Sequence, residues 1–191
     1  MFDWKKALIL CVVGAPLLVV GCAKKEEAPA PAPVVEQPAA APPMMAIAVL
    51  QPRGELTLNG TVSFTQDGDT VTIAAHVEGV APGKHGFHLH EMGDCSAEDF
   101  TSTGGHFNPT EAPHGGPADR VRHAGDFGNI EVGEDCTGHV ELTSDMITVA
   151  AGANTVVGRA VILHEGEDDL ESQPTGAAGG RIACGVVEPS G

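Results

Sequence analysis

The chain has 191 residues, of which 42% are hydrophobic and only 4% are aromatic. This length is sufficient for one globular domain whose core is built from small apolar side chains. The formal net charge of −16 at pH 7 argues against the basic surface that nucleic-acid-binding proteins use.

The first residues have the pattern of an export signal. Lys5 and Lys6 precede an apolar run over residues 7–20, which is too short to span a bilayer comfortably. The run ends in Val19-Val20-Gly21-Cys22, which resembles the lipobox of bacterial lipoproteins, where the cysteine is lipidated and becomes the first mature residue. We interpret residues 1–21 as a signal peptide and expect acyl chains on Cys22 to anchor the protein to a bacterial membrane, in the periplasm or cell envelope. The alternatives are an ordinary signal that is cut elsewhere and an uncleaved anchor.

A linker follows the lipidation candidate. From Ala23 to Pro43, 13 of 21 residues are alanine or proline. Such a segment cannot bury a core and favours extended conformations, so residues 22–43 are expected to form a tether with a reach of roughly 60 Å. The folded domain is expected over residues 44–191.

The rest of the chain has the period of β-strands. "TVTIAAHV" places Val71, Ile73, Ala75 and Val77 on one face, and a glycine-rich or acidic turn separates it from the next run. No segment has the period of a long amphipathic helix, so the pattern predicts an all-β antiparallel sandwich or barrel. Residues 93–125 would then form a long loop, which in a compact domain is functional or disordered. The other short apolar runs are "MAIAVL", "GTVSF", "GHVEL", "RAVIL" and "IACGVV".

Histidines are concentrated in and around this loop. His88 and His90 are two residues apart, so on a strand both imidazoles project from the same face and can reach one ion. An all-imidazole set suits the tetragonal geometry of Cu(II), whereas three imidazoles and a carboxylate suit tetrahedral zinc. The candidate copper ligands are His88, His90, His106 and His164, and the candidate zinc ligands are His106, His114, His123 and Asp126.

Six segments resemble, in order, the motifs of the copper/zinc superoxide dismutases. They are "HGFHLHEMGD", "GGHFNP", "HGGP", "RHAGDFGN", "GRAVILHEGEDDL" and "GAAGGRIACGVV", and the resemblance extends over residues 45–188. It implies an eight-stranded antiparallel Greek-key β-barrel or sandwich. It also implies an enzyme that converts two superoxide anions to dioxygen and hydrogen peroxide by redox cycling of copper, with a structural zinc. The alternative is a non-catalytic copper- and zinc-binding lipoprotein with the same fold.

The resemblance also implies a role for single residues. His106 would bridge copper and zinc and carry a proton, and Asp168 would hydrogen-bond one histidine of each metal. Arg181 would attract the superoxide anion to the copper. Cys95 and Cys184 would form a disulfide, which an exported protein in an oxidising compartment can keep.

The chain departs from the eukaryotic members of this family after Leu170. Only residues 171–174 remain of a longer loop that carries guiding charges in those members. Other cations that could steer superoxide are Lys84, Arg120 and Arg122, but their place relative to the site does not follow from the sequence. The short loop resembles that of bacterial, exported members.

Two histidines fall outside the motifs. His76 and His139 lie on short predicted strands, and both are interpreted as solvated residues rather than ligands. Beyond superoxide and the membrane, a homodimer is a possible assembly, and no nucleic-acid partner is expected.

Overall fold

The computed structural model describes residues 44–190. The predicted signal peptide, Cys22 and the tether lie outside the described residues. Within residues 44–190, no helix is both long and apolar enough to cross a membrane.

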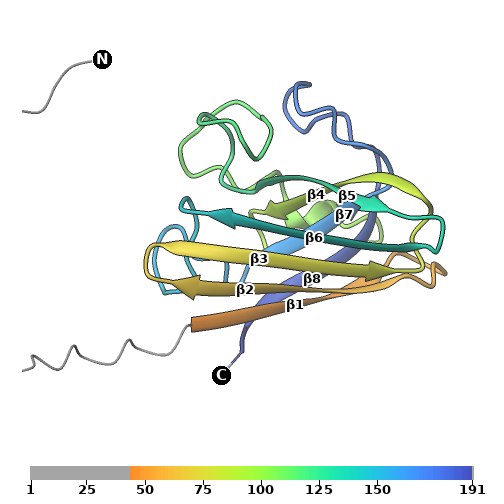
Figure 1. Ribbon diagram of the computed structural model, residues 1–191, viewed down its shortest axis with the longest axis horizontal. Helices are drawn as coiled ribbons and strands as arrows, with labels where there is room; N and C mark the ends of the chain where they lie inside the picture. The colour runs from red at the N-terminus through yellow and green to blue at the C-terminus, as the bar shows by residue number, and fades with distance from the viewer. Residues whose placement is uncertain (1–43, 191) are drawn as a thin grey trace, which may run out of the picture. The chain divides into compact units, whose positions relative to one another are not determined.

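Eight antiparallel strands close into a barrel in the order β1-β2-β3-β6-β5-β4-β7-β8 (Figure 1). In the described part of the chain the only helical element is a single 3-10 turn, η1. This architecture confirms the predicted all-β antiparallel fold. The bounds are β1 (Met44–Pro52), β2 (Asn59–Asp67), β3 (Thr70–Glu78), β4 (Gly83–His90), η1 (Thr101–Thr103), β5 (Asp126–Val132), β6 (Thr137–Ser144), β7 (Ala160–His164) and β8 (Arg181–Ser190).

The core follows from the alternation of the strand sequences. On β3, every second residue from Val71 to Val77 is buried, whereas His76 and Glu78 are exposed. Three aromatic rings fill the middle of the barrel, because Phe127 lies 6.3 Å from Phe64 and 5.5 Å from Phe87, measured between ring centroids.

The barrel consists of two halves with one narrow junction. β5 and β6 pair through a single position, Val132 with Gly138, whereas β1 and β8 pair from Met45 with Ser190 to Pro52 with Ala183. The connections from β3 to β4 and from β6 to β7 cross between the halves, which gives the Greek-key topology. The first and last strands therefore close the barrel.

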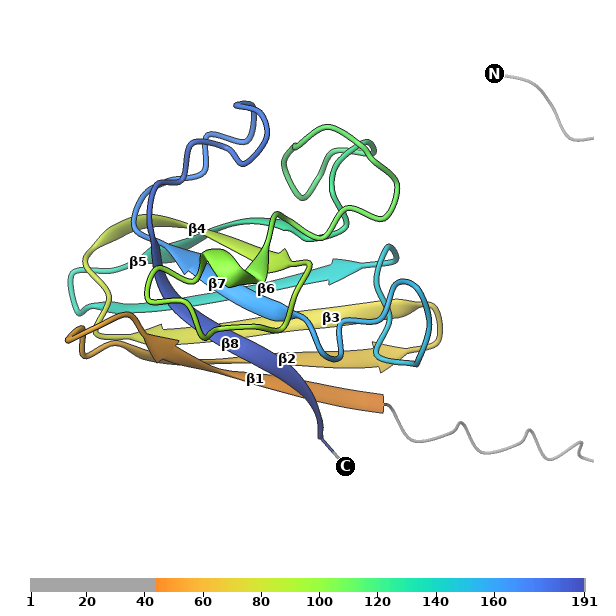
Figure 2. The ribbon, with the colours of Figure 1, turned by 180° about the vertical axis from the view of Figure 1, so that it is seen from behind.

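β4 is the strand that connects the core to the surface loops. Its last six residues are all buried, because Phe87 and Leu89 face the core while His88 and His90 are buried outside it. The long connections after β4 and after β7 both contribute loops that rise from the same side of the barrel (Figures 1 and 2). The histidines on β4 therefore lie where these loops meet.

Candidate metal centre

Four histidines from three parts of the chain form the first cluster. β4 supplies two of them, the loop after β4 supplies the third and the end of β7 supplies the fourth, and all are buried. One ring nitrogen of each lies within 4.8 Å of those of the other three. Within residues 44–190, four of their ring nitrogens are buried without a hydrogen-bond partner, namely Nδ1 of His88 and Nε2 of His90, His106 and His164.

The opposite nitrogen of three of these rings is held by an acceptor. His88 Nε2 donates to Asp168 Oδ2 at 2.7 Å, His90 Nδ1 to the carbonyl oxygen of Gly104 at 3.0 Å, and His164 Nδ1 to that of Gly179 at 3.1 Å. A carbonyl or carboxylate oxygen can only accept, so each of these nitrogens carries the proton of the neutral ring. The free nitrogen of each ring is therefore a lone pair, which is what a metal ion requires.

Burial keeps these rings neutral. It lowers the pKa of His88 and of His90 well below the ordinary histidine value, with the neighbouring His106 adding to the effect. Burial also lowers the pKa of His164, to about 4. Because a metal ion binds the neutral imidazole, the cluster can accept a metal ion at neutral pH without losing protons.

A second cluster surrounds the carboxylate of Asp126 at the start of β5. Its Oδ1 lies 2.8 Å from Nδ1 of His106, 3.0 Å from Nδ1 of His114 and 3.1 Å from Nδ1 of His123. Its Oδ2 accepts the backbone N–H groups of Gly115 and His123. Burial alone would raise the pKa of Asp126, but hydrogen bonds from the histidines hold it well below its usual range. Three nitrogens and an ionised oxygen are a donor set that fits zinc.

His106 belongs to both clusters. Its Nε2 is one of the unpartnered nitrogens of the first cluster, and its Nδ1 faces Asp126 in the second. The ring stacks on that of His88, with centroids 3.9 Å apart. One imidazole can therefore contact two metal ions, one through each nitrogen.

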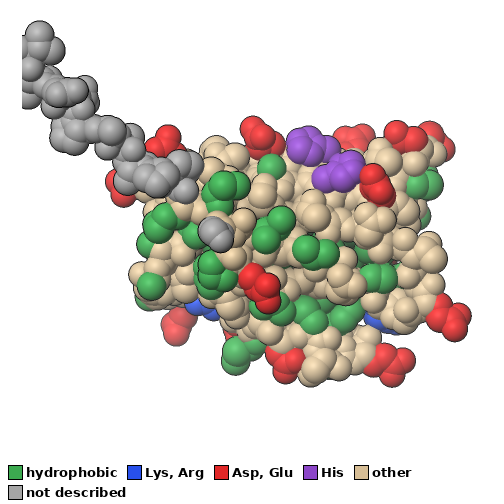
Figure 3. Space-filling view, turned by 90° about the horizontal axis from the view of Figure 1, so that it is seen from below, with side chains coloured by type: hydrophobic (Ala, Val, Ile, Leu, Met, Phe, Trp, Pro, Cys, Tyr) green, Lys and Arg blue, Asp and Glu red, His purple; other side chains and the backbone are tan. Residues whose placement is uncertain are grey.

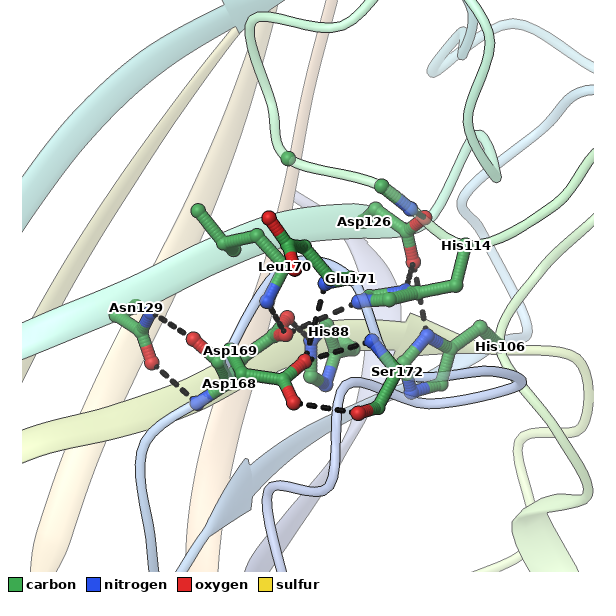
Figure 4. Close-up of polar contacts among 12 residues, drawn as sticks. His88, His106, His114, Asp126, Asn129, Asp168, Asp169, Leu170, Glu171 and Ser172 are labelled. Carbon is green, nitrogen blue, oxygen red and sulfur yellow. Dashed lines mark hydrogen bonds and ion pairs between the residues drawn. The ribbon is translucent and has the colours of Figure 1, made fainter.

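Asp168 connects the two clusters through hydrogen bonds to one histidine of each (Figure 4). One of its oxygens accepts from His88 Nε2 and the other accepts from His114 Nε2 at 3.0 Å. The backbone of Asp168 is held at both ends by Asn129, whose Nδ2 donates to the Asp168 carbonyl and whose Oδ1 accepts the Asp168 N–H. Sequence reasoning gave no role to Asn129, although it lies inside the quoted segment "RHAGDFGN".

Gln173 is a second residue that the sequence did not reveal. Its Oε1 accepts the N–H of His114 at 2.8 Å and its Nε2 donates to the His114 carbonyl at 2.9 Å. The short loop after Leu170 thus holds the backbone of a zinc-ligand candidate. No signal in the sequence links positions 59 residues apart.

Arg181 lies at the start of β8 and is held by the loop that contains η1. Its guanidinium donates to the carbonyl of Phe100 at 2.6 Å, to Thr103 Oγ1 at 2.7 Å and to the carbonyl of Gly104 at 2.8 Å. The Gly104 carbonyl also accepts from His90, so one carbonyl oxygen links Arg181 to a histidine of the first cluster. Within residues 44–190, no carboxylate lies within 4.0 Å of this guanidinium, so its charge is not neutralised by an ion pair.

The other steering candidates are placed differently. Lys84 forms an ion pair with Glu167 at 2.8 Å, on the exposed surface. Arg122 is buried and donates to the carbonyl of Asp119. Of these cations, Arg181 is the one that the structure ties to the histidine clusters.

A disulfide joins Cys95 to Cys184, across 89 positions. Cys184 lies on β8, three residues after Arg181, and Cys95 lies five residues before Phe100, whose carbonyl accepts from the Arg181 side chain. With Phe100, Ala160 and Ile162 the bond forms a small apolar cluster of its own. The disulfide therefore fixes the segment that positions the arginine.

Comparisons with known proteins agree with this geometry. A family model described as copper/zinc superoxide dismutase matches residues 58–187. The extracellular superoxide dismutase [Cu-Zn] of Brugia pahangi is 44% identical over 139 residues, which cover 68% of this chain and 69% of that protein. The crystal structure of the clock protein EA4 shares 42% sequence identity at a TM-score of 0.69, over 78% of this chain and 96% of that one. The chain belongs to the copper/zinc superoxide dismutase family, whose members are oxidoreductases that use copper and zinc.

Proposed function

We propose that the chain dismutes superoxide at a copper ion held by His88, His90, His106 and His164, with zinc held by His106, His114, His123 and Asp126. The observation that carries this proposal is the set of four buried, unpartnered ring nitrogens that converge beside Arg181. A purely structural histidine cluster would satisfy these nitrogens with acceptors, because a buried polar atom without a partner costs free energy.

The metals, Arg181 and His106 have separate roles in the proposed reaction. When bound, copper supplies one-electron redox chemistry and zinc, which is not redox-active, supplies a fixed charge. Arg181 attracts the superoxide anion and orients it beside the first cluster. His106 Nε2 can take up a proton while Asp126 holds its Nδ1 side in place, and so it can deliver one of the two protons that hydrogen peroxide requires.

The direct test is superoxide consumption by the purified protein loaded with copper and zinc, with both metals quantified on the same sample. The same protein loaded with zinc alone is the control. We expect fast turnover only with copper. Two bound metals with negligible turnover would instead assign the chain to the non-catalytic, metal-binding alternative.

Arg181→Ala is expected to lower kcat/KM for superoxide by about tenfold, with metal content unchanged. The protein is strongly acidic and repels the anion at long range, so loss of an unneutralised guanidinium at the site removes a local attraction. The effect should shrink as salt is raised, because screening weakens the attraction in the unmodified protein. Arg181→Lys, which keeps the charge, should retain most of the rate, and equal losses in both variants would show that charge is not what matters.

We further propose that the chain is an exported, lipid-anchored bacterial member of the family, with residues 1–21 as the signal peptide, 22–43 as the tether and 44–191 as the enzyme domain. The proposal is supported by the lipobox-like sequence and by the disulfide, which indicates an oxidising compartment. Metabolic labelling with a radioactive fatty acid should mark the protein and place it in the membrane fraction. Cys22→Ser should abolish the label and Cys11→Ser should not.

The outer face of β1 supports the homodimer as a further proposal. Met45, Ile47 and Val49 point outward along this strand and are exposed by 43%, 37% and 52%. A continuous apolar stripe of this kind is typical of a surface that associates with a partner. Ile47→Asp should convert a dimer to a monomer in sedimentation equilibrium, and a wild-type protein that sediments as a monomer would contradict the proposal.

A further inference from the structure

Two exposed histidines lie outside the metal centre, on the outer face of the barrel. All nine histidines of the chain lie within residues 44–190, and the seven others are buried. His76 on β3 and His139 on β6 are exposed, and the strand register places them directly opposite each other. Figure 3 shows two histidine side chains next to each other, with acidic side chains beside them.

The register brings the two imidazoles within reach of one ion. Directly opposed residues of antiparallel strands have Cβ atoms about 4.5–5.5 Å apart. An imidazole nitrogen binds a metal ion at about 2.0–2.1 Å, so both rings can contact one ion without a change in the backbone. Their ligand atoms are not gathered as tightly as those of the buried clusters, but exposed side chains change rotamer within nanoseconds, so an ion can gather them.

Carboxylates complete the surroundings of this pair. Glu78 Oε1 lies 3.2 Å from His76 Nε2, and both side chains are about half exposed. Glu141 lies two residues beyond His139 and is also exposed, on the same face of β6. Two imidazoles, a carboxylate in contact with one of them and a second carboxylate nearby attract a cation and offer it nitrogen and oxygen ligands.

We propose that His76, His139 and Glu78 form a third metal site, separate from the two buried clusters, that takes a divalent transition-metal ion and prefers Cu(II). The preference follows from the order of stability of divalent ions at nitrogen and oxygen ligands. With two or three protein ligands and water in the remaining positions, the site exchanges its ion rapidly, unlike the enclosed buried centre. It holds copper at the protein surface without enclosing it.

The site is tested by equilibrium dialysis of the full-length protein, already loaded with copper and zinc, against Cu(II). We expect one further copper ion per chain. His76→Gln and His139→Gln should each weaken this binding by at least tenfold without changing the content of the buried centre. Glu188→Gln, which removes an exposed carboxylate from β8, is the matched control and should leave the binding unchanged.

A second variant separates an opposed pair from two surface histidines in general. In His139→Gln combined with Thr143→His, the chain regains an exposed imidazole on β6, but four residues away, or about 13 Å along the strand. We expect no recovery of the third copper ion. Recovery in this variant, retention of the third ion in the His76→Gln/His139→Gln double variant, or its absence from the unmodified protein would each overturn the proposal.

Discussion

His164→Ala should reduce superoxide dismutation more than about 100-fold. His164 belongs only to the first cluster, where its Nε2 is one of four converging lone pairs. Loss of residues that merely support metal ligands costs about 10- to 100-fold in affinity or activity, so loss of a ligand itself should cost more. The measurement is pulse radiolysis of the purified variant, with copper and zinc quantified in the same preparation.

The copper and zinc contents of the variants show which cluster each substitution affects. We expect His164→Ala to lose copper and to keep zinc, because none of the zinc-ligand candidates is touched. His123→Ala is the reciprocal variant, since His123 lies only in the second cluster, and it should lose zinc first. A His164→Ala protein that kept both its copper and its rate would remove His164 from the site.

Cys95→Ser should lower the free energy of unfolding by about 4 kcal/mol, or about a thousandfold in the unfolding equilibrium. The chain-entropy model assigns roughly 4–5 kcal/mol to a bond that closes a loop of 89 positions, and residual structure in the unfolded chain reduces that value. Urea unfolding of the metal-free protein measures the change directly. Metal-free protein is chosen because bound ions would add their own stabilisation.

Two comparisons isolate the bond from the substitution. Adding a reductant should destabilise the unmodified protein by the same amount and should have no further effect on Cys95→Ser. Cys136→Ser changes the one cysteine within residues 44–190 that is outside the disulfide, and it should leave stability within about 0.5 kcal/mol. Equal stabilities of the unmodified protein with and without reductant would mean that the bond constrains little. The bond also positions the carbonyls that hold Arg181, so the reduced protein should lose part of its rate as well.

The sequence was most informative where a periodic pattern met a buried surface. The alternation over β3 predicted its buried face correctly because one side of that strand packs on the core. β5 was not among the predicted strands, since Gly128 and Asn129 interrupt it with residues that are rare in strands. It forms because it pairs along most of its length with β4.

The metal centre, too, was predictable from the sequence only in part. Its ligand candidates could be identified from side-chain chemistry and from the family motifs, and the structure brings them together in two clusters. The acceptors that orient these ligands could not be identified from the sequence, because the carbonyls of Gly104 and Gly179 belong to the backbone and carry no sequence signature. Asn129 and Gln173 act across long sequence separations, which only the folded chain reveals.

The closure of the barrel by β1 and β8 has a consequence for the order of folding. β8, the last strand of the domain in chain order, ends at Ser190, which pairs with Met45 near the start of the domain. Until β8 is available, β1 and β7 each present an unpaired edge that can recruit another chain. Cys184 also lies on β8, so the covalent cross-link has to wait for the same strand. A domain that emerges from its N-terminal end therefore stays open and prone to aggregation until the ten residues of β8 are available, and a truncation that removes β8 would leave it so permanently.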